Sequence, residues 1–202
     1  MDSNHGPPRY KLGALPTELC TRTGMDSIWI CVLLQSFPFC YTPHYMNEFV
    51  AKKLGEVLAF NHVGSETLAK GRAALATVLG EEKILDMEER NKVHGETIVK
   101  IATDAGVLEI TSAKAAKTSE KLRTMRDLYV GDQWDNATEL LEWSGFFEGA
   151  AAVHWALVRG AAEALDHAGL ATLASEGVDW HYELLEIAER ELHSKGADKA
   201  TA

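Results

Sequence analysis

The feature that most constrains this chain is that proline is absent from residue 46 to residue 202. Proline in a helix interior removes a backbone hydrogen bond and clashes with the preceding turn, so long helices are built without it. The same stretch is rich in Ala, Leu, Glu and Lys, which are strong helix formers, and has few runs of β-branched residues. We therefore predict an all-α fold for residues 46–202.

Residues that start and stop helices, together with apolar residues at helical spacing, predict four long helices. These run from about Asn47 to Leu79, Glu81 to Ala105, Trp134 to His167, and Leu170 to His193. Residues 106–133 are predicted to form a connection that contains only a short basic helix, Lys114 to Tyr129. A connection of that length lets the second and third helices run parallel. The expected architecture is a ferritin-like four-helix bundle with one long crossover between helices two and three.

The first 45 residues differ in composition, because they hold all five prolines and all three cysteines of the chain. Residues 2–19 resemble a peptide found at the head of unrelated reading frames that extend through a neighbouring transfer-RNA gene. This resemblance implies a spurious extension and a start at Met46, with Met25 and Met1 as alternatives. A genuine disordered arm is the other interpretation. Both interpretations divide the chain into residues 1–45 and a helical domain, residues 46–202.

Charge and targeting signals narrow the classes of function. The first 45 residues carry three acids and three bases, so the net charge of −10 belongs to the helical domain. An acidic domain disfavours nucleic-acid binding, which relies on clustered Lys and Arg. The apolar run at residues 27–41 is too short to span a membrane and lacks the features of a secretory signal. We expect a cytoplasmic protein without a membrane or nucleic-acid partner.

Several polar side chains are predicted to lie on the buried faces of these helices. His94 and Asn91 fall within the apolar stripe of the second helix, Glu148 lies near that of the third, and His181 near that of the fourth. Imidazole and carboxylate suit iron, zinc or manganese, so one interpretation is a metal site with His94, Glu148 and His181 as ligands. The other is a hydrogen-bonded polar layer without a ligand, for instance Glu148 with Arg72 or His94.

Three segments in the second half of the chain carry a resemblance to a known family. They are DLYVGDQWDNA at 127–137, FEGAA at 147–151 and ELLEIAE at 183–189. Residues 126–193 thereby resemble the second half of the ferritin-like stress proteins of the YciE/YciF type. The resemblance implies a four-helix bundle that is usually dimeric and has a potential two-metal site built from glutamates and histidines on all four helices.

Transferred residue by residue, the resemblance places Glu66 at the carboxylate of helix one, His94 near the imidazole of helix two and Glu148 at the carboxylate of helix three. His181 is the nearest substitute on helix four. The Glu-x-x-His spacing of such sites is absent from helices two and four, and Asn91 occupies the glutamate position before His94. The helical wheel also turns Glu66 away from the apolar stripe, which favours a surface position.

Two functions follow from these observations. The first is a small cytoplasmic ferritin-like homodimer that binds iron or manganese through Glu66, His94, Glu148 and His181 and acts in stress response or metal handling. The second is a metal-free helical-bundle interaction protein that acts through an exposed helix face or a dimer surface. The sequence indicates neither a catalytic residue nor a substrate, since it lacks a phosphate loop, a dinucleotide-binding glycine pattern and a nucleophile elbow.

Overall fold

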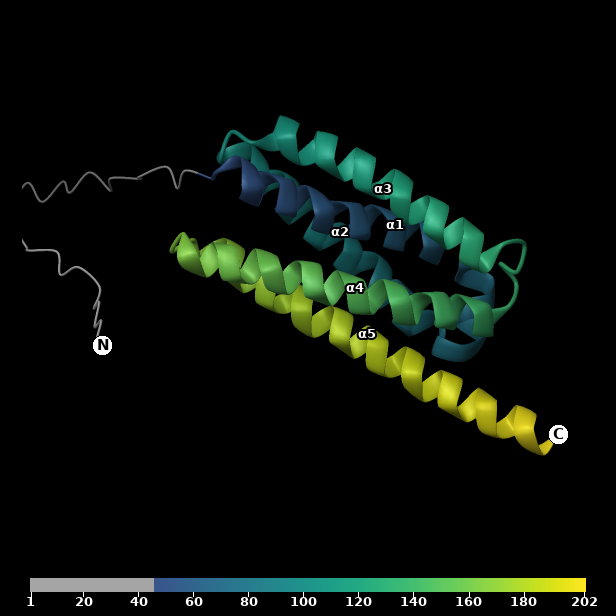
Figure 1. The fold of residues 1–202 in the computed structure, drawn as a ribbon. Helices are drawn as coiled ribbons and strands as arrows, with labels where there is room; N and C mark the ends of the chain where they lie inside the picture. Colours follow the sequence, from purple (N-terminus) through teal and green to yellow (C-terminus); the bar gives the residue numbers. More distant parts are fainter. Residues whose placement is uncertain (1–45) are drawn as a thin grey trace, which may run out of the picture. The chain divides into compact units, whose positions relative to one another are not determined.

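The structure, a computed structural model, describes residues 46–202, and these form five helices without a strand. The predictions made for residues 1–45 lie outside the described part of the chain. The helices are α1 (Glu48–Leu79), α2 (Glu81–Asp104), α3 (Leu108–Val130), α4 (Ala137–Ala164) and α5 (Ala168–Thr201) (Figure 1). The all-α prediction is confirmed, but the number of helices is five rather than four.

The helix missing from the four-helix prediction is α3, which is longer than the short connecting helix expected there. It presents one face at helical spacing to α1 and buries that face. This face consists mainly of small and polar side chains, which look like a solvent-facing surface until a neighbouring helix covers them. Its buried members are Thr111, Ala115, Ser119, Leu122, Arg126 and Val130.

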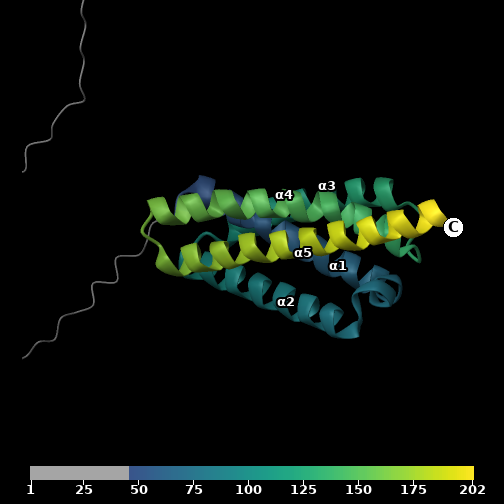
Figure 2. The ribbon, with the colours of Figure 1, turned by 90° about the horizontal axis from the view of Figure 1, so that it is seen from below.

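Helix α1 is the centre of the arrangement, because α2, α3 and α4 all pack along it. Helix α5 packs almost entirely on α4, and its backbone approaches α2 at few points. Figure 2 shows α2 diverging from α5 along its length. Long side chains bridge α2 and α5, among them Lys83, which binds Glu183 at 2.7 Å and lies over the Trp180 ring.

The ends of the first helices follow local rules that were expected from the sequence. Asn47 caps α1 by accepting a hydrogen bond from the Val50 backbone nitrogen at 3.0 Å. Gly80 separates α1 from α2 with a φ of 80°, and Gly106 follows α2 with a φ of 69°. Both values lie in the region that glycine enters without a steric cost. Asn136 caps α4 in the same way as Asn47, through the backbone nitrogen of Thr138.

The core consists of two apolar clusters, one toward each end of α1. The first contains Leu54 and Trp155, and the second contains Leu140 and Phe147. Gly177 on α5 allows the first cluster to close, because a Cβ there would lie 2.5 Å from the Trp155 ring. On α4, Glu148 lies among the residues of the second cluster, between Phe147 and Ala151. None of the five helices combines the length and hydropathy needed to cross a bilayer.

Candidate functional site

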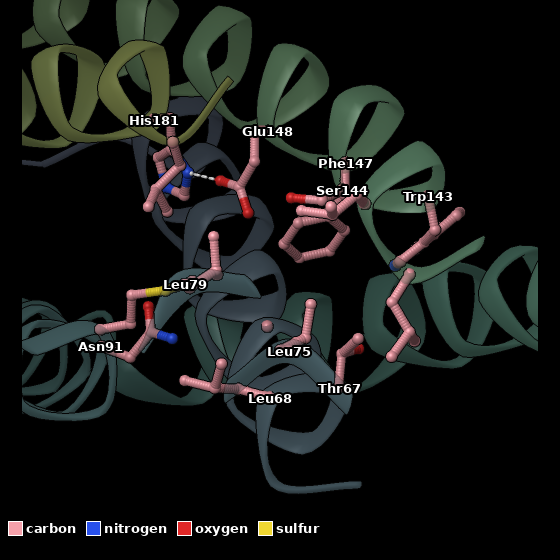
Figure 3. Close-up of a pocket in the computed structure, with 15 residues that line it drawn as sticks. Thr67, Leu68, Leu75, Leu79, Asn91, Trp143, Ser144, Phe147, Glu148 and His181 are labelled. Atoms are coloured by element: carbon pink, nitrogen blue, oxygen red, sulfur yellow. Dashed lines mark hydrogen bonds and ion pairs between the residues drawn. The ribbon is translucent and has the colours of Figure 1, made fainter. Parts of the chain in front are cut away.

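The most deeply buried ionisable groups that meet are Glu148 on α4 and His181 on α5. The His181 Nδ1 donates a hydrogen bond to Glu148 Oε2 at 2.5 Å, and each residue is 6% exposed (Figure 3). A charged group costs several kcal/mol to bury without a partner, so each of these side chains depends on the other. The pair satisfies one carboxylate oxygen and one imidazole nitrogen inside the bundle.

A cavity of about 50 Å³ adjoins this pair and is lined by side chains of α1, α2, α4 and α5. Its polar lining includes Asn91 and Ser144 besides Glu148 and His181. The second oxygen of Glu148 points into the space among the lining residues rather than toward His181 (Figure 3). Most of the wall is apolar and includes Leu68, Leu75, Leu79, Met87, Leu140, Leu141, Phe147 and Leu184.

His94 on α2 is buried next to this pair, and its ring meets the Trp155 ring edge-on at a centroid distance of 5.8 Å. Burial, the largest cause, together with the charges of His181 and Arg90 lowers the pKa of His94 from 6.5 to about 4. His94 is therefore a neutral imidazole at neutral pH. It also lines a separate groove between α2 and α5 that is open to solvent.

Glu66 lies elsewhere, on the side of α1 that faces α3. It is exposed and accepts hydrogen bonds from Arg123 at 2.8 and 2.6 Å, with Arg126 at 3.5 Å. The hydrogen bond from Arg123 is the largest cause of the lowered pKa of Glu66. The structure thus brings Glu148 and His181 together with His94 nearby, but it does not bring Glu66 to them.

The polar layer considered as the alternative to a metal site has different partners from those expected. Arg72 does not reach Glu148, because it binds Glu88 and, at 2.7 Å, Glu81 on α2. The partner of Glu148 is His181 instead. Helical phase correctly indicated that both side chains face inward, but the choice between several inward-facing partners depends on how the helices pack.

A second carboxylate–imidazole pair was not found by sequence reasoning. Glu56 on α1 is buried, and His154 on α4 lies with its Nδ1 3.0 Å from Glu56 Oε2. Lys53 and Lys114 also bind this carboxylate, at 2.8 and 2.9 Å. Burial alone would raise the pKa of Glu56, but the two lysines outweigh burial and keep the pKa below 4.5. The available signal was an acidic residue immediately before the apolar run Val57 to Phe60.

The residues present do not fit the two-metal centre that the family resemblance implies. In residues 46–202, no three of the His, Cys, Asp and Glu side chains lie close enough together to hold a metal ion. Glu148 and His181 supply two donors that already face each other, whereas a catalytic metal typically takes three protein ligands and a two-metal centre about four carboxylates. Binding of iron or manganese stays a prediction from the sequence.

Comparison with known proteins adds no relative to this description. No family model, no curated protein and no solved structure matches the chain.

Proposed function

We propose that the protein is a metal-free, self-associating helical bundle, in which the outer face of α4 binds the same face of a second copy. The observation that carries this proposal is the absence of exposed charge along α4 between Glu142 and Arg159. The proposal takes up the second of the two functions considered from the sequence, an interaction protein with a dimer surface.

Helix α4 has the composition of a helix that is covered on all sides. Between Glu142 and Arg159 its only ionisable residues are Glu148, which is bonded inside the bundle, and His154, which is partly exposed and held by Glu56. A helix at the surface of a protein ordinarily carries charged and polar side chains on its outer face, whereas a helix that is apolar all round is buried. We therefore expect a partner to cover the outer side of α4.

The exposed stripe of α4 consists of Phe146, Ala150, Val153 and Leu157, which we call the α4 face. Phe146 is 65% exposed, Val153 64% and Leu157 40%. Their spacing of seven and four residues places them on one side of the helix, and the stripe is about 16 Å long at 1.5 Å per residue. Scattered exposed apolar residues are ordinary, but a continuous apolar stripe marks an interaction site.

The α4 face is complementary to itself when two copies meet antiparallel. With a two-fold axis between Ala151 and Ala152, Phe146 lies opposite Leu157 of the second copy, and Ala150 lies opposite Val153. Large side chains then alternate with a small one along the contact. Two-fold interfaces require this kind of self-complementarity, because the same patch serves both subunits. The chargeless stripe also presents no like-charge repulsion to a second copy of this acidic chain.

The neighbouring end of α3 extends the same surface. The Tyr129 ring contacts the Phe146 ring at a centroid distance of 5.4 Å. Beside it, Met125 and Leu128 are exposed on α3. A stable interface buries about 800 Å² on each partner. The stripe on α4 alone is too narrow to bury that area. This part of α3 supplies the additional apolar area next to the α4 face.

The test is the oligomeric state of the full chain and of Val153→Glu, measured by sedimentation equilibrium. We expect a dimer for the wild-type protein and a monomer for Val153→Glu, because the substitution places two carboxylates opposite apolar side chains at the centre of the contact. Leu85→Glu is the matched control, since Leu85 is 55% exposed on α2, away from this surface. A monomeric wild-type protein, or a Val153→Glu variant that still dimerises, would overturn the proposal.

The metal-free part of the proposal is tested separately by elemental analysis of the full chain purified without chelator. We expect iron and manganese far below one ion per chain, because the described residues provide no three-ligand site. One ion per chain that disappears in both His94→Ala and His181→Ala would contradict this part and support the iron- or manganese-binding function instead. That outcome would leave the dimer measurement unaffected.

A further inference from the structure

The cavity beside Glu148 contains a hydrogen-bond acceptor to which no described residue donates. Glu148 Oε2 is bound by His181, but Oε1 receives no hydrogen bond from any described residue. Figure 3 shows this oxygen pointing into the cavity. A small molecule with a donor group can therefore enter the cavity and donate a hydrogen bond to this oxygen.

Donors line the same cavity. The Trp143 indole nitrogen is buried without a hydrogen-bond partner among residues 46–202, and Trp143 as a whole is 4% exposed. Figure 3 shows its nitrogen at the end of the side chain that faces the other lining residues, with the Ser144 hydroxyl directed to the same side as Glu148. An occupant that both donates and accepts a hydrogen bond therefore matches the polar groups of this wall.

The rest of the wall determines the size and charge of the occupant. A volume of about 50 Å³ has room for about three or four water-sized groups, and the remaining lining is mainly leucine, methionine and phenylalanine. No Lys or Arg is among the lining residues. The charge of Glu148 already has the imidazole of His181 as its partner, so a neutral occupant suits the site better than a second charge.

We propose that this cavity binds a short-chain alcohol, with its hydroxyl donating to Glu148 Oε1 and its alkyl group lying against the leucines. A hydroxyl supplies one donor and two acceptor lone pairs in a single small group, so it can donate to Glu148 Oε1 and also accept a hydrogen bond. The site lies within the bundle and is independent of the α4 face. The experiment on the cavity can therefore fail without affecting the proposed dimer.

Helix α2 provides the route of entry. Its side chains Met87 and Asn91 form one wall of the cavity. It buries only four residues, Ile84, His94, Ile98 and Ala102, and glycines with positive φ stand at both of its ends. Segments with few buried contacts open at low free energy. Opening of α2 exposes the cavity without disturbing the packing of α4 on α5.

The experiment titrates the full chain with 2-propanol and with acetone, following the indole N–H signal of Trp143 by NMR. The two probes have the same heavy-atom arrangement, but acetone lacks the O–H donor. We expect saturable binding of 2-propanol with a Kd in the millimolar range, since a ligand of this size cannot bind much more tightly. Acetone should bind about tenfold more weakly or not at all, because it cannot satisfy Glu148 Oε1.

Two variants and a control make the test specific. Glu148→Gln keeps the shape of the side chain and turns an N–H₂ donor toward the cavity, so the preference for 2-propanol over acetone should disappear. Glu56→Gln changes the other buried carboxylate and should leave both affinities unchanged. Leu75→Phe fills the cavity and should abolish saturable binding of both probes.

Three results would overturn the proposal. One is the absence of saturation with 2-propanol in the wild-type protein, which would mean that the cavity holds water only. Another is equal affinity for 2-propanol and acetone in the wild-type protein, a comparison that does not depend on whether any variant folds. The third is unchanged 2-propanol binding in Leu75→Phe, which would place the observed binding elsewhere on the chain.

Discussion

Two carboxylate–imidazole pairs lie in this bundle, and their surroundings differ. Glu56 meets His154 together with Lys53 and Lys114, so both of its oxygens are bound, and the His154 side chain is 36% exposed. Glu148 meets His181 alone, both side chains are buried, and one carboxylate oxygen faces a cavity. The same two residue types thus form a well-satisfied ionic cluster in one place and a half-satisfied pair in the other.

The difference shows how the burial of a charge is compensated. At Glu56, two ammonium groups and an imidazole share the compensation, so the loss of any one leaves the others in place. At Glu148, a single imidazole provides it in an apolar surrounding, where electrostatic interactions are strong and an unpaired charge is costly. We therefore expect the stability of the bundle to depend far more on His181 than on His154.

The largest expected effect comes from removing the imidazole of each pair. His181→Ala leaves the Glu148 carboxylate buried without a partner and should lower the free energy of unfolding by about 3–5 kcal/mol. His154→Ala leaves Glu56 with Lys53 and Lys114 and should cost about 1 kcal/mol or less. Urea denaturation of the two variants measures both values. Equal losses in the two variants would contradict the contrast between the pairs.

Replacing both partners of the buried pair should have a smaller effect than replacing one. In the double variant Glu148→Met with His181→Leu, no charge remains to be buried, and apolar side chains of similar size fill the site. We expect a free energy of unfolding within about 1 kcal/mol of the wild-type value, since apolar replacements of buried ion pairs are often neutral or stabilising. A loss as large as that of His181→Ala would mean that packing, rather than the unpaired charge, dominates there.

The next effect is a dependence of stability on pH that comes from His94, beside the Glu148 pair. The pKa of His94 is lowered to about 4 by burial and by the charges of His181 and Arg90. The unfolded chain therefore binds a proton on His94 more tightly than the folded protein does. The contribution of the neutral His94 side chain to the free energy of unfolding is complete above about pH 6.5 and is lost as the pH falls from there through about 4. His94→Gln should remove on the order of 2 kcal/mol of this pH dependence.

The control for this prediction is Glu56→Gln, measured by urea denaturation at the same series of pH values. The pKa of Glu56 is lowered by its lysines against the effect of burial, so its contribution is present above about pH 4.5 and is lost only below that value. Glu56→Gln should therefore leave the slope between pH 6.5 and 5 unchanged. If that slope became flatter in Glu56→Gln but not in His94→Gln, the pH dependence would come from Glu56 rather than from His94.

Much of the fold could be predicted because helix ends and apolar faces depend on nearby residues. Local hydrogen bonds and backbone angles set the helix boundaries at Asn47, Gly80 and Gly106, and the structure has boundaries at these places. Helix α3 was underestimated because its buried face carries Thr111 and Ser119, which do not form an apolar stripe. Such a face is recognised as buried only when α1 is seen against it.

For the candidate site, the sequence predicted which side chains face inward but not which of them meet. Helical phase alone indicates that His94, Glu148 and His181 point inward and that Glu66 does not, because each direction depends on a single helix. Which of the inward groups meet depends on the rotation and separation of different helices. Sequence reasoning therefore offered Arg72 or His94 as partners of Glu148, whereas the packed structure selects His181.

The order of residues in this chain therefore accounts for its helical state, for most helix boundaries and for the side chains that face the core, because these properties arise within a few turns of one helix. The packing of five helices decides the rest: the burial of α3 against α1, the separation of α2 from α5, the Glu56 cluster and the cavity at Glu148. These features join residues far apart in the chain, and only the balance of all packing contacts specifies their relative positions.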